Sequence, residues 1–203
     1  MKRIFPITLI LLCIMCLTSA AQIQFALGLK AGPNFASINT SESATENYKS
    51  RTGFHGGAFA LFKFTKIGIQ PEIIFSQQGS KVTINSSNYD ANYNYVNIPV
   101  IVKLYLAAGL NLQAGPQFGF VSLAEAPRPD DNGNITVQDV KDEAKKSDIS
   151  AALGAGWDLP FGLTIDARYN LGLTKINDDS GASSAKNQVF QVSLGYKLFK
   201  MGE

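Results

Sequence analysis

Apolar and polar side chains alternate at every second position along several stretches of the chain. The clearest stretches are 110–120, 163–173 and 190–198, where apolar residues take one parity and polar residues or glycine take the other. Successive side chains of a β-strand point to opposite faces of its sheet. Each stretch is therefore predicted to be a strand with one apolar face and one polar face.

Extending this count along the chain predicts eight strands and no long helix. The strands are expected at 23–36, 52–64, 67–79, 93–105, 109–122, 148–159, 162–173 and 187–199. Their connections alternate between tight turns (65–66, 106–108 and 160–161) and long polar loops (37–51, 80–92, 123–147 and 174–186). Short periplasmic turns and long outer loops are typical of outer-membrane barrels. The predicted fold is all-β, an eight-stranded antiparallel up-and-down transmembrane β-barrel.

A soluble lipocalin-like barrel shows the same alternation with its apolar face turned inward, so a second observation is needed. The polar face is rich in glycine, which is a poor strand residue on a solvated surface but leaves room inside a narrow barrel. The apolar face carries aromatic residues near both ends of the strands, at Phe25, Phe62, Phe64, Trp157 and Tyr196, and at Phe35, Phe54, Phe75, Phe120 and Phe190. Two such girdles mark the two interfaces of a membrane. The apolar face is therefore expected to contact lipid.

Residues 1–21 are predicted to be a signal peptide, with Lys2 and Arg3, an apolar stretch and small residues before Gln22. Residues 22–203 then form the outer-membrane β-barrel domain. The 182 mature residues (203 − 21) carry 16 basic side chains (18 − 2) and 16 acidic ones. This balance argues against a nucleic-acid partner. Both cysteines fall within 1–21, which excludes a disulfide or a thiolate metal site from the mature domain.

Several short motifs resemble one family over essentially the whole mature chain. They are GLKAGPN at 28–34, GFHGG at 53–57, IQPE at 69–72, SQQG at 76–79, YVNIP at 95–99, QAGPQ at 113–117 and ARYNLGL at 167–173. Together they resemble the PorT-like outer-membrane β-barrel proteins, which occur mainly in Bacteroidetes. The resemblance implies an outer-membrane location and, for PorT itself, a part in type IX protein secretion, whereas many members of the family have no assigned role. Where relatives often carry an acid in the fourth strand, this chain has Asn97.

Parity places eight ionisable side chains on the inward face. They are Lys30, Lys63, Glu72, Lys103, Asp158, Asp166, Arg168 and Lys197. Unpaired charges are costly in a narrow interior, so Glu72 and Asp166 are expected to pair with Arg168, Lys103 or Lys30. These five residues form the predicted lumen charge network. The network is interpreted either as a structural plug or as a polar constriction that selects ions.

No catalytic, cofactor or metal site is predicted from the remaining residues. The only histidine, His55, has no acidic partner evident from the sequence, and 177–181 lacks the spacing of a calcium loop. The loop at 123–147 is interpreted as a docking surface or a solvated cap, with a short helix possible at 137–146. The expected role is non-enzymatic, structural or accessory, with outer-membrane lipid and other envelope or secretion-system proteins as partners. A narrow porin-like conduit for small solutes or ions is the alternative, and a membrane-embedded hydrolase or acyltransferase the third reading.

Overall fold

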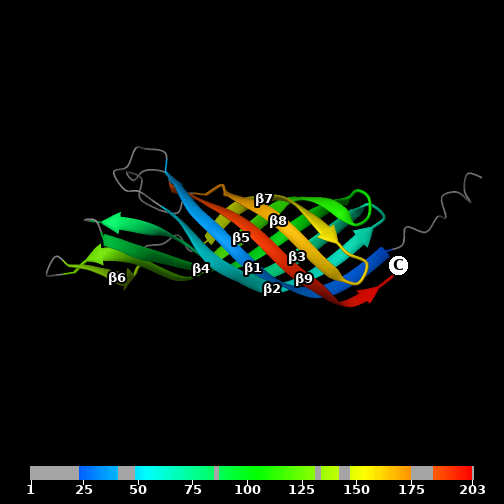
Figure 1. The fold of residues 1–203 in the computed structure, drawn as a ribbon, viewed down its shortest axis with the longest axis horizontal. Coiled ribbons are helices and arrows are strands. Elements are labelled where there is room, and N and C mark those ends of the chain that lie inside the picture. The colour runs from blue at the N-terminus through cyan, green and yellow to red at the C-terminus, as the bar shows by residue number, and fades with distance from the viewer. Residues whose placement is uncertain are drawn as a thin grey trace, which may run out of the picture.

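The computed structural model describes residues 23–40, 49–84, 87–130, 134–141, 147–174 and 185–202. They form an elongated barrel of antiparallel strands (Figure 1). The strands are β1 (Ile23–Thr40), β2 (Lys49–Phe64), β3 (Ile67–Ile84), β4 (Ser87–Tyr105), β5 (Leu110–Pro129), β6 (Ile135–Asp139), β7 (Ser147–Asp158), β8 (Leu163–Gly172) and β9 (Ala185–Met201). The described part contains no helix long and apolar enough to cross a membrane. The predicted signal peptide, 1–21, lies outside the described residues.

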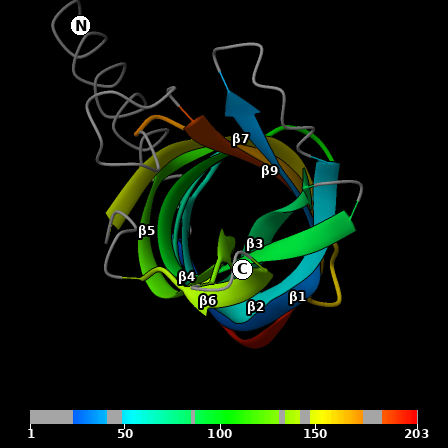
Figure 2. The same cartoon turned by 90° about the vertical axis from the view of Figure 1, so that its left-hand side faces the viewer.

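Eight of the nine strands close into a ring, which confirms the predicted fold class. Each strand pairs with its neighbour in the order β1-β2-β3-β4-β5-β7-β8-β9, and β9 pairs with β1 to close the barrel. The strands surround a common axis when the molecule is viewed from one end (Figure 2). Closure satisfies the backbone donors and acceptors of both edges, which a sheet in hydrocarbon requires. β6 lies outside the ring and pairs with β5 alone among the described strands.

The two faces of the sheet have the polarity of a membrane barrel. Large apolar side chains are exposed on the outer face, for example Leu198 (66%) and Phe54 (65%). Polar side chains fill the inside, where Lys103 is 0% and Gln70 is 1% exposed. The lipocalin-like alternative is therefore wrong. The aromatic residues expected to face lipid do so, and nine of the ten are exposed: Phe35, Phe54, Phe62, Phe64, Phe75, Phe120, Trp157, Phe190 and Tyr196.

At one end of the barrel, opposite the C-terminus, two hairpins extend beyond the ring (Figure 1). The predicted loop at 80–92 is largely strand, because β3 and β4 remain paired as far as Ile84 and Ser87. The predicted loop at 123–147 contains the β5–β6 hairpin, so the short helix considered at 137–146 is wrong over Val137–Asp139. The backbone ladders of these two strand pairs thus continue beyond the ring.

The tight turns lie at the other end of the barrel, where β1 begins and β9 ends. Thr65 and Ala108 have φ of 52°, and Gly109 has φ of 83°. A Cβ atom at position 109 would also overlap the carbonyl oxygen of Asp158, which packs against the β4–β5 turn. This turn therefore needs glycine for conformation and for close approach. It holds the last residue of β7 at the rim of the lumen.

Candidate functional site

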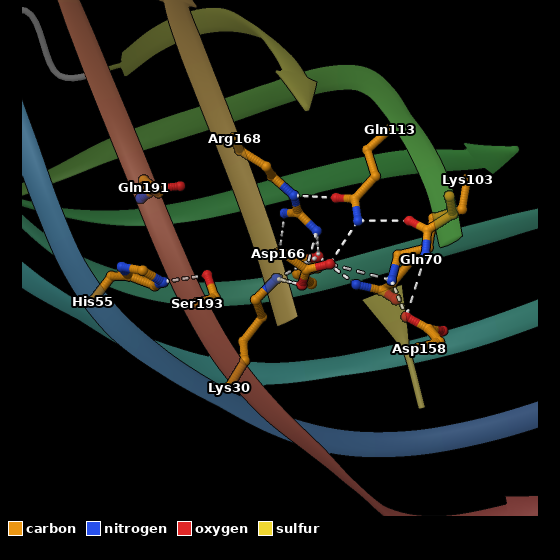
Figure 3. A network of polar contacts seen from close by, with 12 residues as sticks. Lys30, His55, Gln70, Lys103, Gln113, Asp158, Asp166, Arg168, Gln191 and Ser193 are labelled. Atoms are coloured by element: carbon orange, nitrogen blue, oxygen red, sulfur yellow. Dashed lines mark hydrogen bonds and ion pairs between the residues drawn. The ribbon is translucent and has the colours of Figure 1, made fainter. Parts of the chain in front are cut away.

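The five residues of the predicted lumen charge network lie together in the barrel interior (Figure 3). They come from β1, β3, β4 and β8, and each is at most 4% exposed: Lys30, Glu72, Lys103, Asp166 and Arg168. Lys30 Nζ lies 2.8 Å from Asp166 Oδ2 and 3.5 Å from Glu72 Oε1. Lys103 Nζ lies 3.6 Å from Asp166 Oδ1. Each carboxylate is thus shared by two or more cations.

Arg168 and Glu72 make the most complete contact of the network. Arg168 Nη1 donates to Glu72 Oε2 at 2.8 Å, and Nη2 donates to Oε1 at 2.6 Å. This is a bidentate pair, in which two charge-assisted hydrogen bonds fix the geometry of both side chains. Gln70 Nε2 also donates to Glu72 Oε1, at 2.6 Å. The pair joins β3 to β8 across the lumen rather than along one ladder.

Gln113 links the Arg168–Glu72 pair to Asp166, and sequence reasoning missed it. Its Oε1 accepts a hydrogen bond from Arg168 Nε at 2.6 Å, while its Nε2 donates to Asp166 Oδ1 at 2.6 Å. Gly156 faces this contact: a Cβ there would overlap Gln113 Nε2 and Asp166 Oδ1. The inward glycine leaves the space that the amide and the carboxylate occupy. The sequence gives one indication of this contact: Gln113, like Asp166, is at a position whose parity places it on the inward face.

Asp158 is a second hub, nearer the tight turns. Its Oδ1 accepts from Lys103 Nζ at 3.2 Å and from Asn111 Nδ2 at 3.4 Å. Its Oδ2 accepts from Tyr105 OH at 2.8 Å and from Lys197 Nζ at 2.9 Å. Asp158 and Lys197 were assigned to the inward face from parity, but their place in the network was not recognised. Lys103 bridges this hub to Asp166.

Towards the hairpin end the lumen is filled by uncharged polar side chains. Asn34 Nδ2 donates to Ser76 Oγ at 2.8 Å, and Gln191 Nε2 donates to Asn34 Oδ1 at 3.0 Å. Asn170 Nδ2 continues the chain to Gln191 Oε1 at 2.7 Å. Asn97 in this layer is 2% exposed, and its Nδ2 has no hydrogen-bond partner.

His55 meets a serine that the sequence did not suggest as its partner. His55 Nε2 lies 2.7 Å from Ser193 Oγ, a distance suited to a base and a nucleophile. The remaining nitrogen, Nδ1, is buried without a hydrogen-bond partner, so no carboxylate orients the ring. Both side chains are buried, and neither lines the three cavities described below. The arrangement is that of a packed polar pair.

Two cavities occupy opposite ends of the lumen. The one at the tight turns has a volume of about 300 Å³, and the one at the hairpin end has about 10 Å³, room for one water molecule. They share no lining residue, and the charge network lies between them. A third cavity lies on the outer apolar face, between β2 and β9. The interior is thus closed by side chains between its two ends.

The described residues contain no group of three or more histidine, aspartate or glutamate side chains arranged to hold a metal ion. The segment 177–181, considered as a calcium loop from its composition, lies outside the described residues. The carboxylates of the lumen are occupied by lysine and arginine partners, which leaves no oxygen-rich cage for a cation.

Residues 20–178 match the family model described as the outer membrane protein beta-barrel domain. The chain belongs to this family. It is accordingly an outer-membrane protein, as its lipid-facing exterior requires. The comparison with curated proteins finds no match.

Solved outer-membrane barrels share the fold. Neisserial surface protein A is 13% identical, with a TM-score of 0.54 over 85% of this chain and 97% of its own. Ail, the attachment invasion locus protein of Yersinia pestis, was solved in complex with the heparin analogue sucrose octasulfate. It is 13% identical, with a TM-score of 0.53 over 89% of this chain and 99% of its own. At this identity the likeness concerns the fold alone.

Proposed function

We propose that this protein is a closed outer-membrane barrel with a non-enzymatic structural or accessory role in the envelope, linked to protein secretion as in PorT-like proteins. The lumen charge network carries the first part of the proposal. Its side chains join strands on opposite sides of the ring, and the two cavities at the ends of the described lumen share no lining residue. A barrel sealed in this way acts through its rims rather than through a pore.

The two hairpins beyond the ring support an accessory role. Four of the five residues of β6 are exposed, and Val137 at its centre is 48% exposed. Among the described strands β6 pairs with β5 alone, and a short edge strand of this kind offers backbone donors and acceptors to a partner strand. The motifs shared with PorT-like proteins supply the link to secretion. The matching family model supports the barrel but is broader than that subfamily.

A planar-bilayer recording tests the closed lumen. The wild-type protein is expected to give no discrete conductance steps, because buried ion pairs and amides fill the interior. A porin with a water-filled lumen, inserted into the same bilayer, is the positive control. Reproducible steps from the wild-type protein would contradict the closed lumen and favour the narrow conduit.

Site-specific crosslinking in intact cells tests the accessory role. A photo-crosslinking residue at Val137, on β6, is expected to capture a defined envelope protein, identified by mass spectrometry. The matched control is Leu112, which is 51% exposed but lies on the lipid-facing surface of the ring. An accessory role through the hairpins requires products at Val137 that Leu112 does not give. Identical products at both positions, or none, would contradict it.

The narrow conduit remains the second candidate because the lumen is polar throughout its length. Lysine, arginine and amide side chains line it from the tight turns to the hairpin end. A constriction of this kind passes ions only if the paired side chains separate. The same recording distinguishes the two candidates, since only the conduit predicts steps whose size depends on the permeant ion.

A further inference from the structure

The cavity at the tight turns differs in charge from the rest of the lumen. We call it the tight-turn mouth. Its volume of about 300 Å³ is at the lower end of the range for small-molecule sites. The polar side chains that matter for its chemistry are Gln24, Lys63, Tyr105, Asp158, Lys197 and Lys200. Three lysines thus face one carboxylate.

The carboxylate of Asp158 already accepts four hydrogen bonds. Both oxygens of Asp158 already accept hydrogen bonds, from Lys103 and Asn111 on one side and from Tyr105 and Lys197 on the other. Deeper in the lumen Glu72 and Asp166 are taken by Lys30, Lys103 and Arg168. Within the described residues, no carboxylate lies within 4.0 Å of the ammonium group of either Lys63 or Lys200. Among the described residues, neither of these two ammonium groups has an ion-pair partner.

The first of these charges is held in position by the barrel wall. Lys63 lies on the inward face of β2, and its Nζ is 4.3 Å from the centre of the Tyr105 ring. The hydroxyl of Tyr105 is itself fixed by Asp158 at 2.8 Å. An aromatic face attracts an ammonium but does not neutralise it. A partly buried cation without a counter-charge costs free energy, which a bound anion would recover.

We propose that the tight-turn mouth binds a phosphate-bearing ligand through Lys63 and Lys200. A phosphate monoester supplies about 1.5 to 2 negative charges and three acceptor oxygens. The phosphodiester of a phospholipid headgroup supplies a single charge and two free acceptor oxygens. Lysine ammonium groups are suited to phosphate as point charges. The phosphate belongs either to a soluble ester or to a phospholipid headgroup of the adjacent leaflet. Lys63 follows Phe62 and precedes Phe64, which face lipid and are 40% and 42% exposed. The site goes beyond the proposed function and does not depend on whether the lumen conducts.

Calorimetry with inorganic phosphate tests the soluble source. The full-length mature protein is titrated in octyl glucoside, a detergent without phosphate, at neutral pH and low salt. Lys63→Gln and Lys200→Gln are each expected to weaken phosphate binding about tenfold, and added NaCl is expected to weaken it in the wild type. Lys66→Gln is the matched control. Lys66 is exposed on the neighbouring turn but does not line the mouth, so its replacement should leave binding within about twofold.

Native mass spectrometry tests the lipid source. The wild-type protein is expected to retain phosphatidylglycerol in preference to a galactolipid with the same acyl chains, and Lys63→Gln/Lys200→Gln is expected to lose that preference. Circular dichroism and heat-modified gel mobility confirm that each variant is folded before it is compared. Selective binding in either assay supports the site and identifies the source. The proposal is overturned if folded wild-type protein binds neither probe, or if Lys66→Gln weakens binding as much as Lys63→Gln does.

Discussion

Replacing Glu72 with alanine is expected to lower the free energy of unfolding by about 3–5 kcal/mol, the usual cost of removing one partner from a buried ion pair. The substitution leaves both Nη groups of Arg168 without their acceptors and removes the acceptor of Gln70 Nε2. It also leaves Lys30 with Asp166 alone. Urea titration of the protein in detergent or lipid vesicles, followed by circular dichroism, measures the change.

A double-mutant cycle separates the pair from the rest of the network. Arg168→Ala is expected to cost a similar amount alone, while Glu72→Ala/Arg168→Ala should cost clearly less than the sum, because neither charge is then left unpaired. Glu125→Ala is the matched carboxylate control. Glu125 accepts a hydrogen bond from Asn92 at 2.9 Å in the hairpin extension, so its loss should cost about 1 kcal/mol or less. Equal losses at Glu72 and Glu125 would show that the network does not stabilise the barrel.

Strand positions and facing directions could be predicted from the sequence because both depend on period-two alternation. Lys30, Glu72, Lys103, Asp166 and Arg168 were each placed inside by parity, and all five are buried. Parity does not say which inward side chains meet. Arg168 and Glu72 are 96 residues apart and belong to strands that are not neighbours in the sheet. Their contact depends on the stagger of the strands around the closed ring, which no single strand's sequence contains.

The parts that sequence reasoning missed share a physical cause. Gln113, Asn111 and Gln70 are neutral amides, and a search for pairs of opposite charge overlooks them. In the structure Gln113 accepts from Arg168 and donates to Asp166 and to Asn111. Asn111 donates to Asp158 and Gln70 donates to Glu72, so the network is continuous rather than a set of separate pairs. The strand extensions were missed because polar residues dominate 80–92 and 123–147, although apolar residues still alternate at Val82 and Ile84 and at Ile135 and Val137. In the structure the backbone ladders continue there and pair β3 with β4 and β5 with β6.

A barrel of this kind reverses the usual arrangement of polar and apolar groups. The lipid supplies the apolar surroundings of the outer face, so the interior must be held by polar contacts that satisfy one another. Lys30, Lys103, Arg168 and Lys197 each form an ion pair with Glu72, Asp158 or Asp166. The lysines of the lumen that have no ion pair among the described residues, Lys63 and Lys200, lie at the tight-turn mouth. The paired network and the excess of lysine at the mouth are thus separate features of the same interior.

Placing a methyl group at Gly156 tests how tightly that lumen is packed. Gly156→Ala is expected to lower the free energy of unfolding by about 1–3 kcal/mol, the usual cost of overpacking a filled interior. The added Cβ would overlap Gln113 Nε2 and Asp166 Oδ1 and would lie 3.0 Å from Asn111 Oδ1. The network would have to move, which weakens the hydrogen bonds that Gln113 makes to Arg168 and Asp166. Urea titration followed by circular dichroism measures the loss.

Gly56→Ala is the matched control, since it adds the same methyl group to another strand of the barrel, β2, on the outer face of the sheet. The nearest atoms to a Cβ at Gly56 are Ala31 Cβ and the Lys30 carbonyl oxygen, both at 3.8 Å, an ordinary contact distance. Its φ is not positive, so alanine should leave stability unchanged or raise it by up to about 1 kcal/mol through the unfolded chain. A barrel that tolerated Gly156→Ala as well as Gly56→Ala would have spare room around Gln113 and Asp166. The charge network would then be too loosely packed to seal the lumen, and the closed-barrel proposal would lose its main support.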